Sequence, residues 1–314
     1  MNVLTLNGIT KYYKTVTALN NVSFAVPKGS VFGILGPNGS GKTTLLGIVT
    51  DVLRASAGTY TFFDGSKPVN EIRKDMGVLL ETPNFYPYLS AYLNLEIVAK
   101  IKNCNTAQID EVLKKVNLHE RRFSAFRTFS LGMKQRLAIA SALLGDPKVV
   151  ILDEPTNGLD PEGISEIRQL IKRLATEGKT VILASHLLDE VEKVCTHVAI
   201  LKKGELLVAG DVTGALSREQ KPSNASNANY MPEEKELEMI EVEATDIEKL
   251  IATLRLMDGI KDLKHIESVL TIFHYKGELT AEAVNKYCFD SGIVLSKLIA
   301  KSKTLESKFL ELTK

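Results

Sequence analysis

A glycine-rich run that ends in lysine and threonine is the clearest chemical feature of the sequence. Residues 36–43 read Gly-Pro-Asn-Gly-Ser-Gly-Lys-Thr, which fits the pattern G-x-x-x-x-G-K-[ST] of a phosphate-binding loop. Glycines let backbone N–H groups turn toward a phosphate without a Cβ in the way. The N-terminus of the helix expected after the loop adds partial positive charge. The spacing therefore predicts a site for the phosphates of a nucleotide.

Two residues of this motif have a specific chemical role in binding a nucleotide. Lys42 would place its ammonium group on the β- and γ-phosphates, and Thr43 would offer its hydroxyl to Mg²⁺. A glycine-rich turn with an incidental lysine is the alternative interpretation. The apolar run 31–35 before the loop favours nucleotide binding, because the motif requires a strand there. The expected contact set is Gly36, Pro37, Asn38, Gly39, Ser40, Gly41, Lys42, Thr43 and Thr44.

A second group of chemical residues follows two other apolar runs. Asp153 and Glu154 come directly after residues 149–152, and His186 follows residues 181–184 and one serine. Ligands of open α/β sheets gather at the carboxyl ends of the strands. Asp153 is therefore expected to hold Mg²⁺, and Glu154 to orient or deprotonate an attacking water. His186 would hydrogen-bond the γ-phosphate and that water. A lone histidine is more often structural, but the three strand-end sites together favour the catalytic role.

The elements that must position these residues alternate between strand and helix. We expect strands at 149–152, 181–184 and 198–201 and helices at 163–176 and 186–194. This alternation predicts a parallel sheet covered by helices. Nearer the N-terminus we expect strands at 3–6, 22–26, 31–35 and 59–63, with a turn at Asn7-Gly8 and a hairpin turn at Asp64-Gly65.

Three further segments complete the domain organisation, which places residues 1–215 in one domain. Residues 85–146 are expected to be a helical insert, with helices from Ser90 to about Lys102, around 109–116 and at 137–144. The low-complexity run near 217–232 predicts a linker at 216–235. Residues 236–314 read strand, helix, strand, strand, helix, strand, then a helix at 305–312. That order predicts a small ferredoxin-like α+β domain.

Composition limits the classes of function. The chain has 314 residues, enough for about two domains, and 44% of them are hydrophobic. A net charge of +1 argues against a nucleic-acid partner. Three distant cysteines form no metal-binding spacing and suit a reducing compartment. No apolar run approaches the roughly 20 residues of a membrane span, and the N-terminus lacks the features of a signal peptide. Any membrane role would therefore come through a partner.

Over residues 1–215 the chain resembles the ATP-binding subunit of an ABC transporter. The loop GPNGSGKTT is followed by the Walker B segment VVILDEP (149–155), and residues 157–160, Asn-Gly-Leu-Asp, look like the D-loop. His186 looks like the switch histidine. Within Lys11-Tyr12-Tyr13, the resemblance implies that Tyr13 stacks on adenine, with Tyr12 as the fallback and a plain strand aromatic as the other interpretation.

The family signature, usually LSGGQ, reads Phe129-Ser130-Leu131-Gly132-Met133 here. The resemblance implies that Ser130, Gly132 and Asp160 contact ATP on a second subunit, so that two ATP molecules lie in a head-to-tail dimer. Leu131 departs from the glycine of the pattern, which puts close backbone approach at that position in doubt. Glu81 replaces the expected glutamine of the Q-loop. It is a third candidate Mg²⁺ ligand, or a solvated loop acid.

The resemblance carries a complete set of expectations. The fold would be a P-loop NTPase cassette of the ABC type, with a parallel or mixed sheet core, an antiparallel β subdomain and the helical insert. The activity would be hydrolysis of ATP with Mg²⁺, by Glu154 and His186. The partners would be an integral membrane permease on a separate chain and a second copy or a homologous cassette. The chain would then lie in the cytoplasm, peripheral on the inner face of the membrane.

The residues Glu81 and Leu131 also resemble the subset associated with export of peptide antibiotics and drugs. A soluble ABC-type ATPase without a transport role and a small-molecule kinase are the alternatives. The identity of the cargo, the choice between homodimer and heterodimer and the role of the C-terminal domain stay open at this point.

Overall fold

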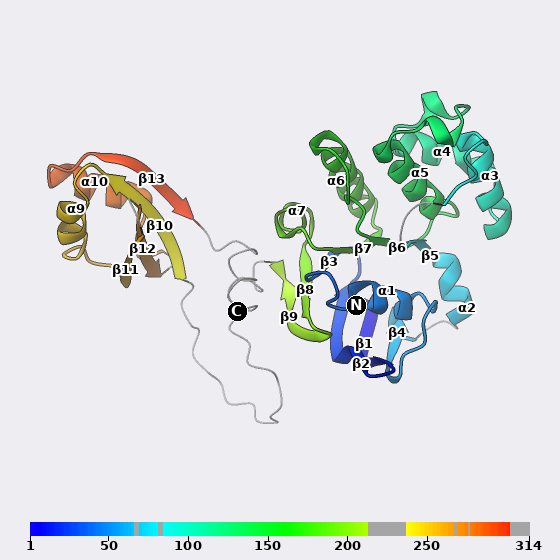
Figure 1. Cartoon of the computed structure of the whole chain (residues 1–314), viewed down its shortest axis with the longest axis horizontal. Coiled ribbons are helices and arrows are strands. Elements are labelled where there is room, and N and C mark those ends of the chain that lie inside the picture. The colour runs from blue at the N-terminus through cyan, green and yellow to red at the C-terminus, as the bar shows by residue number, and fades with distance from the viewer. Residues whose placement is uncertain (66–68, 81–83, 213–236, 267–268, 276, 302–314) are drawn as a thin grey trace. The chain divides into compact units, whose positions relative to one another are not determined.

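The structure is a computed structural model that describes residues 1–65, 69–80, 84–212, 237–266, 269–275 and 277–301. The chain divides into two compact units, the first ending at Ala215 and the second beginning at Leu216 (Figure 1). The expected linker at 216–235 lies outside the described residues.

The first unit is built on a six-stranded sheet with the order β5-β6-β7-β3-β8-β9. Its strands are β3 (Val31–Leu35), β5 (Met76–Leu79), β6 (Val149–Asp153), β7 (Thr180–Ser185), β8 (His197–Lys202) and β9 (Glu205–Asp211). Five strands are parallel, as the alternation of strands and helices predicts, and every residue of β3, β6 and β7 is buried. Burial on both faces explains their continuous apolar runs. The sequence interpretation missed β9, which pairs antiparallel with β8 and makes the sheet mixed.

A second, antiparallel sheet has the order β2-β1-β4. It consists of β1 (Asn2–Tyr13), β2 (Val16–Pro27) and β4 (Ala57–Phe62). The expected turn at Asn7-Gly8 is wrong: β1 runs through these residues with an irregular register between Leu6 and Ile9, and Gly8 has φ +63°. A glycine in this conformation builds a β-bulge, which inserts one extra residue without ending the strand. The predicted hairpin at Asp64-Gly65 is also wrong, because β4 pairs with β1 and the chain then enters the six-stranded sheet.

Helices cover both faces of the six-stranded sheet (Figure 1). Helix α1 (Lys42–Val49) packs between the two sheets, where Leu45, Leu46 and Ile48 join a core formed by strands of both. Helices α6 (Pro161–Thr176) and α7 (Leu188–Val194) pack on the opposite face of the six-stranded sheet. The short α2 (Val69–Ile72) precedes β5. This layering holds α1 at the carboxyl end of β3.

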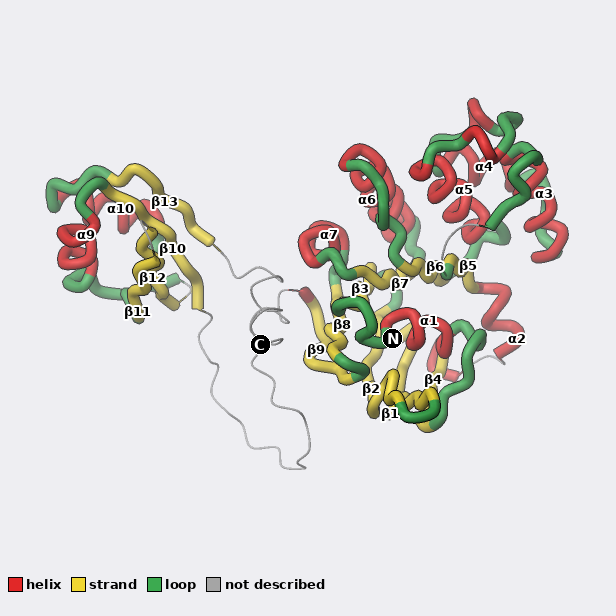
Figure 2. The backbone as a smooth tube through the Cα atoms, in the orientation of Figure 1, coloured by secondary structure: helices red, strands yellow, loops and turns green. Residues whose placement is uncertain are grey.

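Three helices make the insert: α3 (Ala91–Lys102), α4 (Gln108–Lys115) and α5 (Leu131–Leu143), drawn in red in Figure 2. Ser90 caps α3 as predicted, through its hydroxyl, which accepts from the backbone N–H of Leu93 at 3.2 Å. Helix α5 includes most of the predicted helical stretch 137–144 and begins after Ser130, which caps it in the same way.

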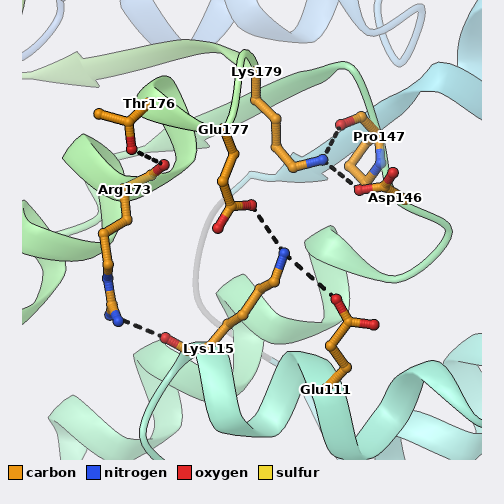
Figure 3. A network of polar contacts seen from close by, with 8 residues as sticks. All are labelled: Glu111, Lys115, Asp146, Pro147, Arg173, Thr176, Glu177 and Lys179. Carbon is orange, nitrogen blue, oxygen red and sulfur yellow. Dashed lines mark hydrogen bonds and ion pairs between the residues drawn. The ribbon is translucent and has the colours of Figure 1, made fainter.

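A polar network joins the insert to the sheet (Figure 3). Nζ of Lys115 on α4 lies 2.9 Å from the carboxylate of Glu177, which follows α6, and 3.7 Å from that of Glu111. Nζ of Lys179, which precedes β7, lies 2.5 Å from Asp146 in the loop after α5. Helix α5 carries Ser130 at its start, so this network fixes the far end of the same helix against the core.

The second unit has six described elements: β10 (Leu237–Ala244), α9 (Ile247–Leu254), β11 (Asp262–Ile266), β12 (Val269–Tyr275), α10 (Ala281–Asp290) and β13 (Leu295–Lys301). The four strands form one antiparallel sheet with the order β11-β12-β10-β13. This is the ferredoxin-like arrangement that the sequence predicts. Apolar residues of β10, β12 and both helices form its core. The expected helix at 305–312 lies outside the described residues.

No helix in the described part of the chain is long and apolar enough to cross a membrane.

Candidate functional site

The loop 36–41 connects β3 to α1, and its shape requires glycine at two points. A Cβ on Gly36 would lie 2.3 Å from the carbonyl oxygen of Leu201 and 2.4 Å from Oγ of Ser40. Gly41 has φ +104°, and a Cβ there would lie 2.6 Å from the carbonyl oxygen of Ala18. Neither position accepts a side chain without a shift of backbone. The motif glycines therefore let the loop lie directly against the strands below it.

Gly204 supports this loop from the turn between β8 and β9. Its backbone N–H donates to the carbonyl of Ser40 at 3.0 Å, and its own carbonyl accepts from Asn20 at 2.8 Å. The sequence interpretation missed this residue. The available signal was the pair Lys203-Gly204 after a buried strand, which is typical of a tight turn.

Lys42 is buried, and its ammonium group faces the loop. Nζ donates to the carbonyl of Gly36 at 2.8 Å and lies 3.6 Å from Oε1 of Glu154. Oγ of Ser40 is also buried and has no hydrogen-bond partner among the described residues. A buried cation, an unpartnered hydroxyl and a helix N-terminus at one place suit a polyphosphate. These residues fit the phosphates of ATP.

Glu154 lies between Lys42 and His186. Its Oε2 is 2.9 Å from Nδ1 of His186, while its Oε1 faces Lys42. Glu154 has φ +47°, and its backbone N–H donates to the carbonyl of Ala184 at 3.0 Å. A non-glycine residue in this region is strained and is commonly held that way at functional sites. The strained turn places the carboxylate beside both the ammonium group of Lys42 and the ring of His186.

Sheet topology explains why these residues meet. Strand β7 lies between β6 and β3, and Asp153 pairs with Ala184 while Leu35 pairs with Ser185. The carboxyl ends of the three strands therefore coincide at one edge. The loop, the acidic pair and His186, although far apart in sequence, are brought to this edge together.

Two oxygen donors of this edge suit Mg²⁺. Asp153 is 6% exposed at the end of β6, and Thr43 is exposed in the first turn of α1. Mg²⁺ takes oxygen ligands and is usually held by one or two protein groups together with substrate phosphates. Among the residues that the structure covers, no group of three or more His, Cys, Asp or Glu could hold a metal alone. Glu81 lies outside the described residues.

Tyr13 ends β1, and its side chain is 42% exposed. Nζ of Lys11 lies 5.1 Å from the centre of the Tyr13 ring, within the range of a cation–π contact. The carbonyl of Arg54 holds Lys11 there through a hydrogen bond of 2.7 Å. Tyr12 is also exposed. Both rings are accessible for stacking. A nucleobase that stacks on Tyr13 would contact the same ring as the ammonium group of Lys11.

Ser130, Gly132 and Asp160 lie on a separate hollow of about 440 Å³ between the starts of α5 and α6. Both polar side chains already cap helices: Oγ of Ser130 accepts from the N–H of Met133, and Oδ1 of Asp160 accepts from the N–H of Gly163. In the part of the chain that the structure describes, no residue of 36–44 lines this hollow. The candidate residues therefore fall into two groups, one around Lys42 and one around Ser130.

The sequence interpretation missed Arg136 on the rim of this hollow. Its Nη1 lies 3.3 Å from the carboxylate of Glu166 on α6, so it links α5 with α6 beside Ser130. The spacing was the available signal, because Arg136 follows Leu131 and Gly132 by about one helical turn on the same helix.

Comparison with known proteins gives consistent results. The family described as "ABC transporter" matches residues 19–157. The uncharacterized ABC transporter ATP-binding protein YhcH of Bacillus subtilis (strain 168) is 45% identical over 65% of this chain and 68% of its own. The bacitracin transport ATP-binding protein BcrA of Bacillus licheniformis is 33% identical over 99% of this chain and 97% of its own. The ATP-binding cassette MJ0796, solved as a dimer in a post-hydrolysis state with ADP and Pi, has a TM-score of 0.60 and 28% identity, and covers 66% of this chain and 98% of its own.

Proposed function

This chain belongs to the family of ABC transporter ATP-binding proteins, and on that basis we propose that it powers an exporter of peptide antibiotics. It binds and hydrolyses ATP with Mg²⁺ and works with a membrane permease on another chain. The observation that carries the ATPase part of the proposal is the position of Glu154, between the ammonium group of Lys42 and the ring of His186.

The proposed chemistry at this edge rests on charge and position. When ATP binds, its phosphates would replace the carbonyl of Gly36 and the carboxylate of Glu154 as partners of the Lys42 ammonium group. The carboxylate of Glu154 can then accept a proton from the attacking water. The contact with His186 keeps this carboxylate oriented. Mg²⁺, held by Thr43 and Asp153, would neutralise charge on the phosphates.

The two groups of site residues support a sandwich of two cassettes. A single chain holds Lys42 and Glu154 on one edge and Ser130 on a separate hollow. ATP bound at the first group of one copy would meet Ser130, Gly132 and Asp160 of another. The N-terminus of α5 then faces the γ-phosphate, where its partial positive charge is favourable. A second copy of this chain or a homologous cassette would complete each site.

The proposed cargo class rests on the full-length relative. The bacitracin transport protein BcrA of Bacillus licheniformis aligns over 99% of this chain, so the similarity includes the ferredoxin-like unit. An export motor of this type would bind the permease at the inner face of the cell membrane. Peptide antibiotics that act at the cell surface are the substrate class that such an exporter would remove.

Co-expression with a membrane permease, identified by its co-purification with the tagged chain, tests this proposal. Cells that produce both chains should tolerate several times more bacitracin than cells that produce the permease with a Glu154→Gln chain. The tagged chain should also co-purify with the permease and release phosphate from ATP. Equal tolerance in both strains would exclude bacitracin-type cargo. Absence of any membrane protein from the fraction that co-purifies with the tagged chain would contradict the transport role.

A further inference from the structure

Leu131 packs against the D-loop, residues 157–160. A Cβ on Gly158 would lie 3.1 Å from Cδ2 of Leu131, so the leucine occupies the space that a side chain at 158 would need. Gly158 has φ +73°, which also favours glycine. On the other side of the same contact, a Cβ on Gly132 would lie 3.9 Å from Cδ2 of Leu159. The start of α5 and the D-loop therefore interdigitate.

The D-loop is in turn tied to the catalytic edge by two backbone turns. The N–H of Asn157 donates to the carbonyl of Glu154 at 3.1 Å, and the N–H of Leu159 donates to the carbonyl of Thr156 at 3.3 Å. Glu154 itself stands in a strained conformation, with φ +47°. Such a conformation persists only where the surrounding structure holds it. These turns run from Glu154 to Asn157 and from Thr156 to Leu159, so they lead from the strained residue to the two neighbours of Gly158, against which Leu131 packs.

We propose that Leu131 is a positioning residue, which holds the D-loop against the start of α5 and thereby fixes the carboxylate of Glu154. The inference rests on the proposed function, because it gives Glu154 its role in hydrolysis. The side chain of Leu131 is 50% exposed, so part of it lies on the D-loop while the rest remains on the surface of the hollow. A glycine at 131 would leave this contact unmade.

The contact has a consequence for a dimer of cassettes. Ser130 at the start of α5 would meet the ATP held by the partner copy, whereas Glu154 of the same chain acts on its own ATP. A movement of α5 on binding the partner's ATP would reach Glu154 through Leu131 and Gly158. Leu131 therefore couples the occupancy of one site to the geometry of the other.

The opposite role is obstruction, and the two roles predict opposite results for Leu131→Gly. If Leu131 only blocks close approach to the partner's phosphate, then a glycine tightens the ATP-dependent dimer and raises kcat. If Leu131 positions the D-loop, then the glycine variant loses roughly tenfold or more in kcat with little change in KM. A misplaced Glu154 would slow the hydrolysis step but would leave the binding of ATP largely intact.

Hydrogen exchange in the nucleotide-free chain tests the contact without reliance on hydrolysis. We expect the amides of Asn157 and Leu159 to exchange roughly tenfold faster in Leu131→Gly, because the turns open more often. Leu131→Met keeps an apolar side chain of similar volume and should restore both exchange and kcat. Leu93→Gly is the matched control, since Leu93 is a comparably exposed leucine in the first turn of α3.

The outcomes separate the two hypotheses. Unchanged exchange at Asn157 and Leu159 in Leu131→Gly, or a higher kcat, would overturn the positioning role. Failure of the wild-type chain to hydrolyse ATP would overturn the proposed function, while the exchange result would still decide whether Leu131 holds the D-loop. Lower kcat in Leu93→Gly to the same degree would show that general loss of helix stability explains the effect.

Discussion

Nδ1 of His186 lies 2.9 Å from Oε2 of Glu154, and this contact joins the ends of two neighbouring parallel strands. A carboxylate accepts hydrogen bonds only, so the contact places a proton on Nδ1 and fixes the orientation of the ring. The other carboxylate oxygen of Glu154 faces Lys42 at 3.6 Å. One carboxylate thus connects the phosphate-binding lysine with the histidine.

Glu154→Gln should lower kcat for ATP hydrolysis by roughly 10²- to 10⁴-fold, the usual loss for a general base. The amide cannot accept a proton from water at neutral pH, although its shape still fits between Lys42 and His186. ATP affinity should stay close to wild type, and the trapped ATP should favour the dimer. Phosphate release and light scattering with Mg-ATP measure the two effects.

His186→Ala tests the same pair from the other side. If both residues act as one unit, then the double variant with Glu154→Gln should be little slower than the single variants. A wild-type rate in Glu154→Gln, or strictly additive losses in the double variant, would contradict this account of the pair.

Gly41→Ala should destabilise the cassette by more than the roughly 1–2 kcal/mol that a left-handed conformation costs an ordinary residue. The added Cβ would lie 2.6 Å from the carbonyl oxygen of Ala18, so the loop must move. Gly178→Ala is the control, since Gly178 has φ +85° and no atom within 4 Å of the added Cβ. Urea unfolding should give a larger loss for Gly41→Ala, and only that variant should bind ATP more weakly.

Ser130→Ala should cost about 1 kcal/mol of stability through the lost helix cap and should also weaken the ATP-dependent dimer. Ser90→Ala is a matched control, because Ser90 caps α3 with the same hydroxyl-to-amide contact, at 3.2 Å compared with 3.3 Å. If both variants lose the same stability but only Ser130→Ala dimerises poorly, then Ser130 contacts ATP in addition to capping the helix. Equal dimerisation by both variants would leave Ser130 with the cap alone.

Asp146→Asn tests the network that joins the insert to the sheet. The hydrogen bond from Lys179 holds the pKa of Asp146 below its usual value of 3.8. Its stabilisation is therefore present above pH 3.8 and is lost as the pH falls through the lower pKa of the folded state. Asp146 is largely exposed, so we expect no more than about 1 kcal/mol, reduced by salt.

Thermal unfolding at several pH values measures this effect. The difference between the wild type and Asp146→Asn should be constant near neutral pH and should shrink in acid. Asp189→Asn breaks an exposed pair with Lys193 within one helix and should change stability less. A difference for Asp146→Asn that grows in acid would contradict the assigned sign.

Tyr13→Ala should weaken ATP binding by about 1–3 kcal/mol, the usual value of a stacking contact between a base and an aromatic ring. Tyr13→Phe should keep the affinity, because the ring alone stacks. Fluorescent ATP titration measures both, and Tyr12→Ala distinguishes the two neighbouring rings. Loss of affinity in Tyr12→Ala only would move the stacking role to Tyr12.

Much of the core could be predicted from the sequence because buried parallel strands read as continuous apolar runs. Residues 31–35, 149–152 and 181–184 have no polar member, and the structure places strands on all three. Errors occurred where a local signal had two physical solutions. Asn7-Gly8 is compatible with a turn or with a bulge. The structure has a bulge there, because β1 pairs with β2 on one side and with β4 on the other.

The sequence alone determined which chemical groups the protein has and their local setting. The loop 36–43, the acids that follow 149–152 and the histidine after 181–184 are local patterns, each dictated by a strand end and the residues beside it. Tertiary structure decided which of these groups meet. The strand order β6-β7-β3 put Glu154 between Lys42 and His186, and packing put Leu131 against Gly158. Those contacts join residues far apart in the chain, so they depend on the order of strands and on side-chain packing, which no local pattern encodes.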